Sequence, residues 1–364
     1  MINFKKTKCF GIFFLVLFLY IFLSTKTFNH KHKLNALLNI NTVGKNENYP
    51  IDLVYLWCEE NQYREKIRHE LAKKFGVLKN IDTNNKDQTT EARFISNDEL
   101  KYSLRSVEKY APWINKIYIV TDNQVPKWLN LKHPKIKIID HKDIIPSAAR
   151  PNFNSNAIEH CVVNIKGLNE HFLYANDDMM FFGKVEPGDF FKDGKPIYIF
   201  NDKLMPNKVD SYKTTLIRSY DRMKEKFGFY YFDLQRYPHH NIDPYTKTNI
   251  FNCQKDFKQD IEETINSRFR SSKNIQRNIY TLHSIYKNAA YYKTQKRTFF
   301  DFIFGKYKQI SNMFGMHEID NLHIKPGSMK MLCINDNEYT TDFNRSKYKS
   351  MMEELFPEKS SFEK

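Results

Sequence analysis

A run of strand-forming residues leads directly into two consecutive carboxylates in the middle of the chain. Residues 172–175 (FLYA) favour a strand, and Asn176, Asp177 and Asp178 follow it immediately. Ligands of open α/β sheets bind outside the carboxyl ends of the strands, and paired carboxylates there are suited to holding Mg²⁺ or Mn²⁺ against a diphosphate. The pattern therefore favours an enzyme that uses a phosphate-bearing donor such as a nucleotide sugar. The alternative is an Asn-Asp-Asp turn whose side chains only cap a helix.

The order of the strand and helix patterns predicts an α/β fold. Apolar runs rich in β-branched residues predict strands at 50–57, 117–121, 136–140 and 172–175. Helical patterns occur after Ser96 and at 60–76, 155–166, 256–266 and 273–292. Ser96 and Glu99 have the spacing of a capping box, so Ser96 is the expected N-cap of its helix. Strands that alternate with helices predict a Rossmann-like, mostly parallel sheet with helical additions after it.

The charge of the chain suits an anionic partner. The 364 residues carry 57 Lys and Arg against 42 Asp and Glu, a net charge of +15. Phosphorylated sugars, lipid headgroups and nucleic acid would all match this surplus, but no zinc-finger, RNP-type or helix-turn-helix signature appears, so we expect no nucleic acid partner. Much of the lysine is also expected on a solvated face. Five scattered cysteines without a C-x-x-C pair imply neither a disulfide framework nor a zinc site.

The N-terminus predicts a membrane anchor. Lys5, Lys6 and Lys8 precede an apolar run at 9–23 that no clear small-residue cleavage site follows, so a signal anchor (1–24) is favoured over a cleaved signal peptide. A polar stalk (25–49) and a catalytic domain (50–364) are expected after it. Basic residues flank the run on both sides and leave the orientation open. A bacterial protein is expected at the inner membrane with its catalytic domain on the cytoplasmic face, and a eukaryotic one in a Golgi-type lumen.

The first predicted strand carries a carboxylate and two aromatic side chains. Alternation places Tyr55 and Trp57 on one face of the strand. One interpretation is an aromatic that stacks on a uracil base, with Asp52 facing a ribose or a metal ion. The alternative is that Tyr55 and Trp57 pack in the core.

Further polar residues of the first half are candidates for donor binding. Arg93, Asn97 and Arg105 surround the start of the helix near Ser96. A helix N-terminus is a natural phosphate site, and arginine supplies paired donors. Asn123 follows the strand at 117–121, where a nucleotide is expected. A capped surface helix is the alternative.

The second half supplies candidates for the acceptor and for the chemistry. Asn154 and Asn156, at the start of the 155–166 helix, line an acceptor pocket in one interpretation and only cap the helix in the other. His239 and His240 stand in a proline-braced loop, where histidine is the natural general base for a sugar hydroxyl; two exposed loop histidines are the alternative. Arg270 is a candidate clamp for the donor diphosphate, or part of a solvated basic patch.

The opening pattern recurs near the C-terminus. Residues 331–334 (MLCI) favour a strand, and Asn335 and Asp336 follow. A second set of oxygen ligands from this segment would complete the site, with Asn335 on the substrate and Asp336 on the metal ion. The alternative is an Asn-Asp turn.

Several of these segments together resemble the Stealth proteins, a family that includes bacterial capsular-polysaccharide phosphotransferases and the α/β subunit of the lysosomal-enzyme N-acetylglucosamine-1-phosphotransferase. Four blocks carry the resemblance in order: IDLVYLW (51–57); the stretch from RFISNDEL (93–100) to LNEHFLYANDDMMF (168–181); PHHNIDPYTK (238–247) with RFRSSKNI (268–275); and CINDNEY (333–339) with ELFPEKSSFE (354–363). Two departures stand out. Cys58-Glu59-Glu60 replaces the usual Val-Asp-Gly or Val-Asn-Gly, and Arg236-Tyr237-Pro238 replaces the usual His-x-Pro.

The resemblance implies an enzyme that moves a sugar 1-phosphate from a nucleotide sugar of the UDP-HexNAc type to a glycan hydroxyl. It implies that Asp177 and Asp178 orient the metal-bound diphosphate, that His240 or His239 takes the acceptor proton, and that Arg270 stabilises the developing charge. Two other functions stay open. One is a glycosyltransferase that breaks the bond at the anomeric carbon, and the other is an inactive carbohydrate-binding relative, which the altered loop at Cys58 would suit.

Overall fold

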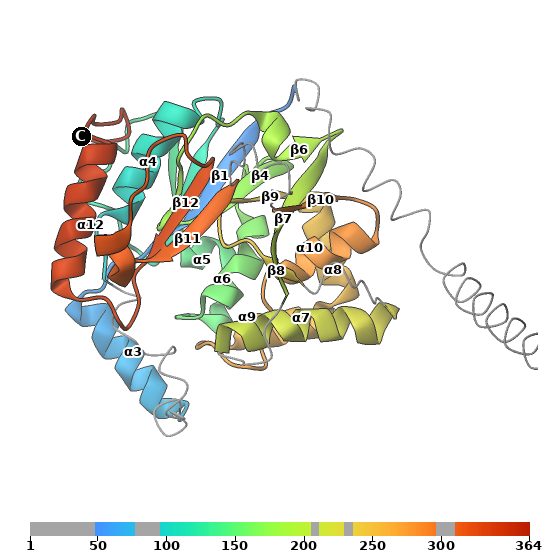
Figure 1. Ribbon diagram of the computed structural model, residues 1–364. Coiled ribbons are helices and arrows are strands. Elements are labelled where there is room, and N and C mark those ends of the chain that lie inside the picture. Colours follow the sequence, from blue (N-terminus) through green and yellow to red (C-terminus); the bar gives the residue numbers. More distant parts are fainter. Residues whose placement is uncertain (1–47, 77–94, 205–210, 229–235, 296–309) are drawn as a thin grey trace, which may run out of the picture. The chain divides into compact units, whose positions relative to one another are not determined.

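A computed structural model describes residues 48–76, 95–204, 211–228, 236–295 and 310–364 (Figure 1). The predicted anchor (1–24), all but the last two residues of the predicted stalk (25–49), and Arg93 lie outside these ranges. No helix within the described ranges is both long and apolar enough to cross a membrane.

The central sheet confirms the predicted Rossmann-like topology. Its strand order is β3-β2-β1-β4-β9, and β1 to β4 run parallel while β9 is antiparallel to β4. The strands are β1 (Ile51–Leu56), β2 (Ile117–Thr121), β3 (Ile136–Asp140), β4 (His171–Asn176) and β9 (Asp243–Thr246). The carboxyl ends of β1 and β4 therefore lie side by side, with Leu56 in register with Asn176.

The apolar runs form strands because both faces of the sheet are covered. Every residue of β2 is buried, as are five of the six residues of β1, which is typical of parallel strands that lie between layers. Helix α4 (Glu99–Tyr110) places Leu100, Leu104 and Val107 in the same core cluster as β1 and β2. This i, i+4, i+7 spacing makes one apolar stripe, which holds α4 against the sheet.

Two smaller sheets complete the strand framework. One has the order β11-β12-β5 and the other β10-β7-β6, with β8 paired to β7. Their strands are β5 (Met179–Phe181), β6 (Phe191–Lys192), β7 (Lys195–Leu204), β8 (Arg236–Pro238), β10 (Tyr291–Gln295), β11 (Ser311–Gly315) and β12 (Met331–Asn335). Because β12 is antiparallel to β5 with Cys333 opposite Met179, the end of β12 reaches the turn between β4 and β5. Figure 1 shows β11 and β12 in front of β1.

Each predicted helical region contains a helix with shifted ends. The bounds of the helices are α3 (Gln62–Lys74), α5 (His141–Ile144), α6 (Ser155–Cys161), α7 (Ser211–Phe227), α8 (Lys247–Asp256), α9 (Lys258–Asn266), α10 (Asn278–Tyr286) and α12 (Asp342–Leu355). Of these, α5, α7, α8 and α12 were not predicted. The helix expected at 155–166 ends at Cys161 and continues as a 3₁₀ turn, Val162–Asn164. The helix expected at 273–292 is confined to Asn278–Tyr286.

The predicted capping box at Ser96 is wrong. Helix α4 begins at Glu99, and its N-cap is Asp98, whose φ is 65°. The Glu99 carboxylate accepts hydrogen bonds from the backbone N–H of Asn97 at 2.6 Å and from Asn97 Nδ2 at 2.8 Å. Glu99 is thus bound to the residue before the cap, so it cannot close a box with Ser96.

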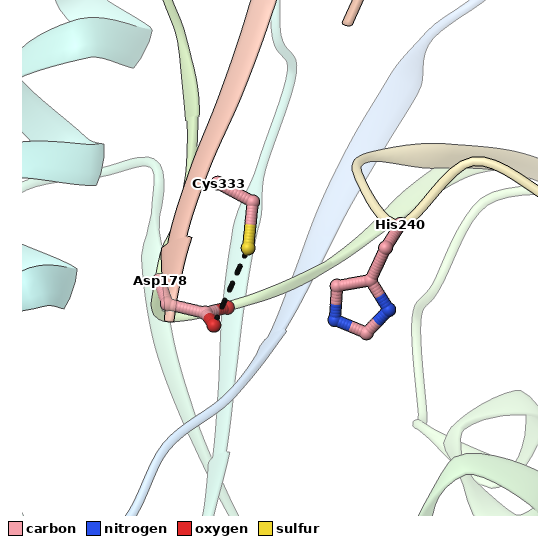
Figure 2. Close-up of side chains that lie close together, drawn as sticks. All are labelled: Asp178, His240 and Cys333. Atoms are coloured by element: carbon pink, nitrogen blue, oxygen red, sulfur yellow. Dashed lines mark hydrogen bonds between the residues drawn. The ribbon is translucent and has the colours of Figure 1, made fainter. Parts of the chain in front are cut away.

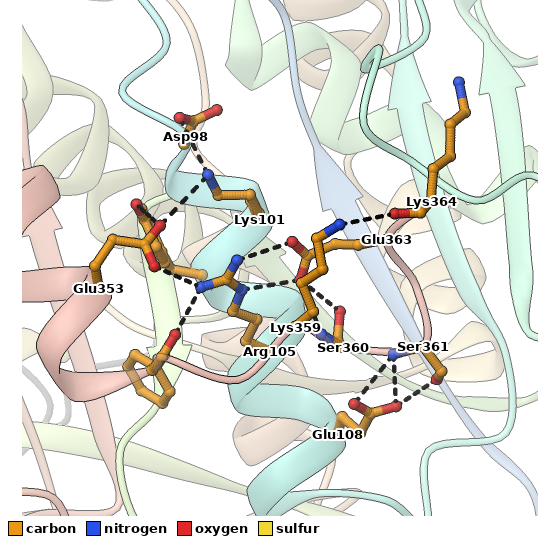
Figure 3. Close-up of polar contacts among 12 residues, drawn as sticks. Asp98, Lys101, Arg105, Glu108, Glu353, Lys359, Ser360, Ser361, Glu363 and Lys364 are labelled. Carbon is orange, nitrogen blue, oxygen red and sulfur yellow. Dashed lines mark hydrogen bonds and ion pairs between the residues drawn. The ribbon is translucent and has the colours of Figure 1, made fainter.

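Arg105 fastens the C-terminal segment to α4 (Figure 3). Its Nε and Nη2 each donate to one carboxylate oxygen of Glu363 at 2.9 Å, and its Nη1 donates to Glu353 at 3.0 Å. The guanidinium also donates to the carbonyl of Phe356 at 2.7 Å. The prediction that Arg105 binds a phosphate is not supported, because these contacts from α12 and the C-terminus occupy its donors.

We expect Arg105→Lys to lower the free energy of unfolding by about 1.5–3 kcal/mol, since lysine cannot reproduce the paired donors that Glu363 accepts. Urea unfolding measures the change. Lys258→Arg is the control, because Lys258 forms an exposed pair with Glu262, for which we expect less than about 1 kcal/mol. Equal effects of the two substitutions would contradict this role of Arg105.

Candidate active site

Asp177 and Asp178 form the turn between β4 and β5, at the carboxyl end of the central sheet. Asp178 is buried, with 7% of its surface exposed. Its Oδ2 accepts a hydrogen bond from Asn335 Nδ2 at 2.9 Å and one from the Cys333 thiol at 3.4 Å. Its Oδ1 is buried without a hydrogen-bond partner. The turn therefore presents one carboxylate oxygen that is fixed in place and one that is available to a ligand.

His240 lies beside Asp178. It stands in the segment between β8 and β9, and one ligand atom each of Asp178, His240 and Cys333 lies within 4.8 Å of the others (Figure 2). Burial lowers the pKa of His240 to about 4, although the charge of Asp178 acts in the opposite direction. The imidazole is therefore neutral at neutral pH, which is the form that accepts a proton.

Three carboxyl groups gather around the turn. Burial, with the charges of Glu99 and Asp178 adding to it, raises the pKa of Asp177 well above its ordinary value. Burial also raises the pKa of Glu99 to about 7. Neighbouring carboxylates that repel one another in a buried place are suited to a bound cation, which would compensate their charge.

We expect the stability of the protein to fall as the pH rises from about 4.5 to 7, because folded Glu99 holds its proton more tightly than unfolded Glu99 does. A raised carboxyl pKa of this size lowers the free energy of unfolding by about 2–3 kcal/mol between pH 5 and pH 8. Glu99→Gln should reduce that difference in the free energy of unfolding, whereas Glu70→Gln on exposed α3 should not. Parallel pH profiles for Glu99→Gln and the wild type, measured by urea unfolding without divalent cations, would contradict this expectation.

His239 belongs to a buried network behind the site. Its Nδ1 lies 2.8 Å from Ser311 Oγ and its Nε2 lies 2.8 Å from Asp243 Oδ1. Arg277 donates to Asp243 Oδ2 at 3.1 Å and to Glu159 Oε1 at 3.4 Å. Burial alone would raise the pKa of Asp243, but His239 and then Arg277 hold it below its ordinary value. Both ring nitrogens of His239 are engaged, so the structure separates the two histidines that the sequence could not rank.

The network reaches the β4–β5 turn through Tyr174. Arg277 lies over the Tyr174 ring, 4.6 Å from its centroid. The Tyr174 hydroxyl lies 2.9 Å from Asn176 Oδ1 and 3.2 Å from Glu159 Oε1. Asn176, a predicted substrate-binding residue, is thereby held in place by Tyr174, next to Asp177.

The start of α6 carries three further predicted site residues. Arg270 donates through its Nε to Ser155 Oγ at 3.2 Å, and its charge lowers the pKa of Glu159 against the larger effect of burial. Asn154 is the N-cap of α6 and donates to the Ser267 carbonyl and to Asn274, so its side chain is structural. Asn156 is buried, with 5% exposed, one residue into the helix.

The residues predicted from the first strand are part of the framework. Asp52 is fully buried at the opposite, amino-terminal end of the sheet, where it accepts hydrogen bonds from Asn115 and Asn169. Tyr55 donates to Ser103 Oγ at 2.6 Å, and Ser103 donates to the Met179 carbonyl. Trp57 packs in the same core cluster as Tyr55. The core-packing alternative therefore describes Tyr55 and Trp57, and Asp52 lies at the far end of the sheet from Asp177 and Asp178.

Other predicted residues lie at the margin of the site. Asp336 accepts from Arg345 Nε at 2.8 Å and Nη2 at 3.2 Å, so its predicted metal-binding role is replaced by an ion pair. Asn97 donates to Asp336 and Glu99 and so links this pair to the carboxyl cluster. Asn123 is exposed after β2 with a φ of 54°.

Sequence reasoning assigned no role to Cys333, Asp243 or Arg277. A signal for Cys333 was available: it stands two positions before Asn335, and alternation along a strand puts such residues on one face. No comparable signal existed for Asp243 and Arg277, because their ion pair joins segments 34 residues apart.

Comparisons with known proteins find related sequences over most of the chain. The family model "Stealth protein CR2, conserved region 2" matches residues 93–220. The exopolysaccharide phosphotransferase cps2G of Lactiplantibacillus plantarum is 33% identical over 352 residues, covering 87% of this chain and 97% of that protein. The capsular polysaccharide phosphotransferase WcwK of Streptococcus pneumoniae is 29% identical, covering 86% of this chain and 99% of that protein.

Solved structures give a weaker likeness. The galactosyltransferase LgtC, in complex with donor and acceptor sugar analogues, is 10% identical, with 84% of this chain and 95% of that chain covered and a TM-score of 0.37. A likeness at this level supports no argument about function.

Proposed function

Because the chain belongs to the Stealth protein family, we propose that it is a phosphotransferase that moves a sugar 1-phosphate from a nucleotide sugar to a glycan hydroxyl in capsule or exopolysaccharide synthesis. The observation that carries the proposal is the meeting of Asp178, His240 and Asn335 at the carboxyl end of a parallel sheet. These groups come from three segments that are far apart in the sequence. The chain is also 33% identical, over 87% of its length, to an exopolysaccharide phosphotransferase.

The acidic groups of the turn fit a divalent cation. Asp178 Oδ1 is buried and unpartnered, and the charges of Glu99 and Asp178 add to the burial that raises the pKa of Asp177. Asp177 and Asp178 would hold Mg²⁺ or Mn²⁺, which would offset the charge of the donor diphosphate.

His240 is the general base in this proposal. The acceptor hydroxyl loses its proton to the neutral imidazole while its oxygen attacks the sugar-proximal phosphorus of the donor. The bond from that phosphorus to the nucleoside phosphate breaks, so a nucleoside monophosphate leaves and a phosphodiester forms. His239 is not suited to this role, because Ser311 and Asp243 engage both of its ring nitrogens.

Arg270 and Asn335 position the reacting groups in this account. Asn335 fixes Asp178 by donating to its Oδ2, so the free oxygen keeps its direction. Arg270, held by Ser155 at the start of α6, would stabilise charge that develops on the phosphoryl oxygens. We also propose that the apolar run at 9–23 anchors the enzyme at the inner membrane of a bacterium.

The test is product analysis with the full chain. The protein is incubated with a panel of nucleotide sugars, beginning with UDP-N-acetylglucosamine, with Mg²⁺ or Mn²⁺ and with glycan acceptors, and the products are followed by phosphorus NMR. A new phosphodiester resonance together with the nucleoside monophosphate is the expected result. Release of the nucleoside diphosphate without a phosphodiester would replace the proposal with plain glycosyl transfer.

A further inference from the structure

We propose that Asp178, His240 and Cys333 form a binding site for a zinc-type transition metal ion, and that occupation of this site blocks transfer. The three side chains come from the β4–β5 turn, the segment before β9 and strand β12, and Figure 2 shows them side by side. Their spacing in the sequence gave no sign of a metal site, since no two of them lie close together in the chain.

The donor set differs from what Mg²⁺ prefers. Mg²⁺ takes oxygen ligands in octahedral geometry, whereas one carboxylate, one imidazole and one thiol suit Zn²⁺ and its neighbours among the transition metals. Three protein ligands with a fourth position left to water or substrate is the arrangement of an open zinc site. The ions that would support transfer and the ion that would fit this set are therefore different.

The distances are close to those that a zinc ion needs. Tetrahedral Zn²⁺ with bonds of about 2.0–2.3 Å brings neighbouring ligand atoms to about 3.3–3.8 Å from one another. The Cys333 sulfur lies 3.4 Å from Asp178 Oδ2, and all three ligand atoms lie within 4.8 Å of one another. Small side-chain rotations of His240 would therefore suffice to complete the site.

Two features of Asp178 point to a ligand. Its Oδ1 is buried without a hydrogen-bond partner although the side chain is more than nine-tenths buried. Its Oδ2 is oriented by Asn335 at 2.9 Å, the kind of outer contact that fixes a metal-ligating carboxylate. Coordination would break the Cys333 S–H bond, form an S–Zn bond and release the proton to solvent.

Occupation would disable two proposed catalytic groups at once. A ring nitrogen of His240 that coordinates a metal ion cannot accept the proton of an acceptor hydroxyl, and Asp178 would be withdrawn from the activating cation. Inhibition by Zn²⁺ rests on the proposed function, whereas binding of the metal ion does not.

Cobalt spectroscopy tests the binding without any substrate. The full chain is treated with a chelator, freed of it, and titrated with Co²⁺, which reports thiolate ligation through a near-ultraviolet charge-transfer band and tetrahedral geometry through intense visible bands. We expect the charge-transfer band in the wild type, its displacement by Zn²⁺ and its loss in Cys333→Ser. His240→Gln should still show the thiolate band, but its affinity for Co²⁺ should be at least about tenfold lower than that of the wild type.

Two cysteine controls identify the ligand. Burial raises the pKa of Cys58 and the charge of nearby Asp177 adds to this effect, whereas Cys253 is buried against the Ile279 carbonyl. Cys58→Ser and Cys253→Ser should keep the band. A titration without a thiolate band in the wild type, or a band that persists in Cys333→Ser, would overturn the site. The transfer assay tests inhibition: Zn²⁺ should inhibit Cys333→Ser at least about tenfold less strongly than the wild type, each relative to its own uninhibited rate. Equal inhibition of the two proteins would overturn the proposal that occupation of the site blocks transfer. A protein without transfer activity would contradict only the proposed function, because the cobalt titration tests binding by itself.

Discussion

Asp178→Asn is expected to lower kcat/KM for sugar-phosphate transfer by about a thousandfold or more. The substitution keeps the size of the side chain and an oxygen that can accept from Asn335, so the local fold is preserved. It removes the negative charge that would hold the cation, and it places an amide NH2, which cannot ligate a cation, at the position of the unpartnered Oδ1. Initial rates of nucleoside monophosphate release measure the effect.

The control for this substitution is Asp221→Asn on the exposed side of α7, which should leave the rate within about twofold of the wild type. Urea unfolding of both variants shows whether the fold is intact. A folded Asp178→Asn protein that keeps more than about a tenth of the wild-type rate would rule out the assigned role of Asp178.

Arg277→Met is expected to lower the free energy of unfolding by about 3–5 kcal/mol. Arg277 is 6% exposed and is the only positively charged side chain recorded in ion pairs with both Asp243 and Glu159 among the described residues. Methionine fills a similar space but leaves Glu159 buried without its ion-pair partner and Asp243 with His239 alone. The loss should also loosen Tyr174, whose ring lies under the guanidinium, and through it the turn that carries Asp177.

Lys258→Met is the matched control for Arg277→Met, because Lys258 forms an exposed i, i+4 pair with Glu262 on α9. That pair should contribute less than about 1 kcal/mol. Both variants are compared by urea unfolding at one pH. If Arg277→Met falls within about 1 kcal/mol of the control, the network does not stabilise the site as described.

The sequence predicted the parallel strands of the central sheet because their signal is local. The β-branched runs at 117–121 and 136–140 form β2, which is buried throughout, and the edge strand β3, in which only Ile136 is buried. The two strand-then-Asn-Asp patterns also indicated segments that the fold brings together, with Asn335 bound to Asp178.

The remaining site residues depend on contacts that no local pattern encodes. Arg105 looked like a phosphate ligand, yet its partner Glu363 lies 258 residues further along the chain. Asp52 looked like a site carboxylate, but it stands at the start of its strand, whereas ligands bind where parallel strands end. The choice between His239 and His240 required knowing that Ser311 and Asp243 engage both ring nitrogens of His239.

The most direct test of the account is the fate of the oxygen that bridges the sugar and the phosphorus in the donor. A nucleotide sugar labelled with ¹⁸O at the oxygen between the anomeric carbon and its phosphorus is turned over by the full chain, and the products are examined by mass spectrometry. The account predicts that the label passes with the sugar 1-phosphate into the glycan phosphodiester and that the nucleoside monophosphate contains none. Label retained in a released nucleoside diphosphate would show that the bond at the anomeric carbon was broken, and sugar-phosphate transfer would be contradicted.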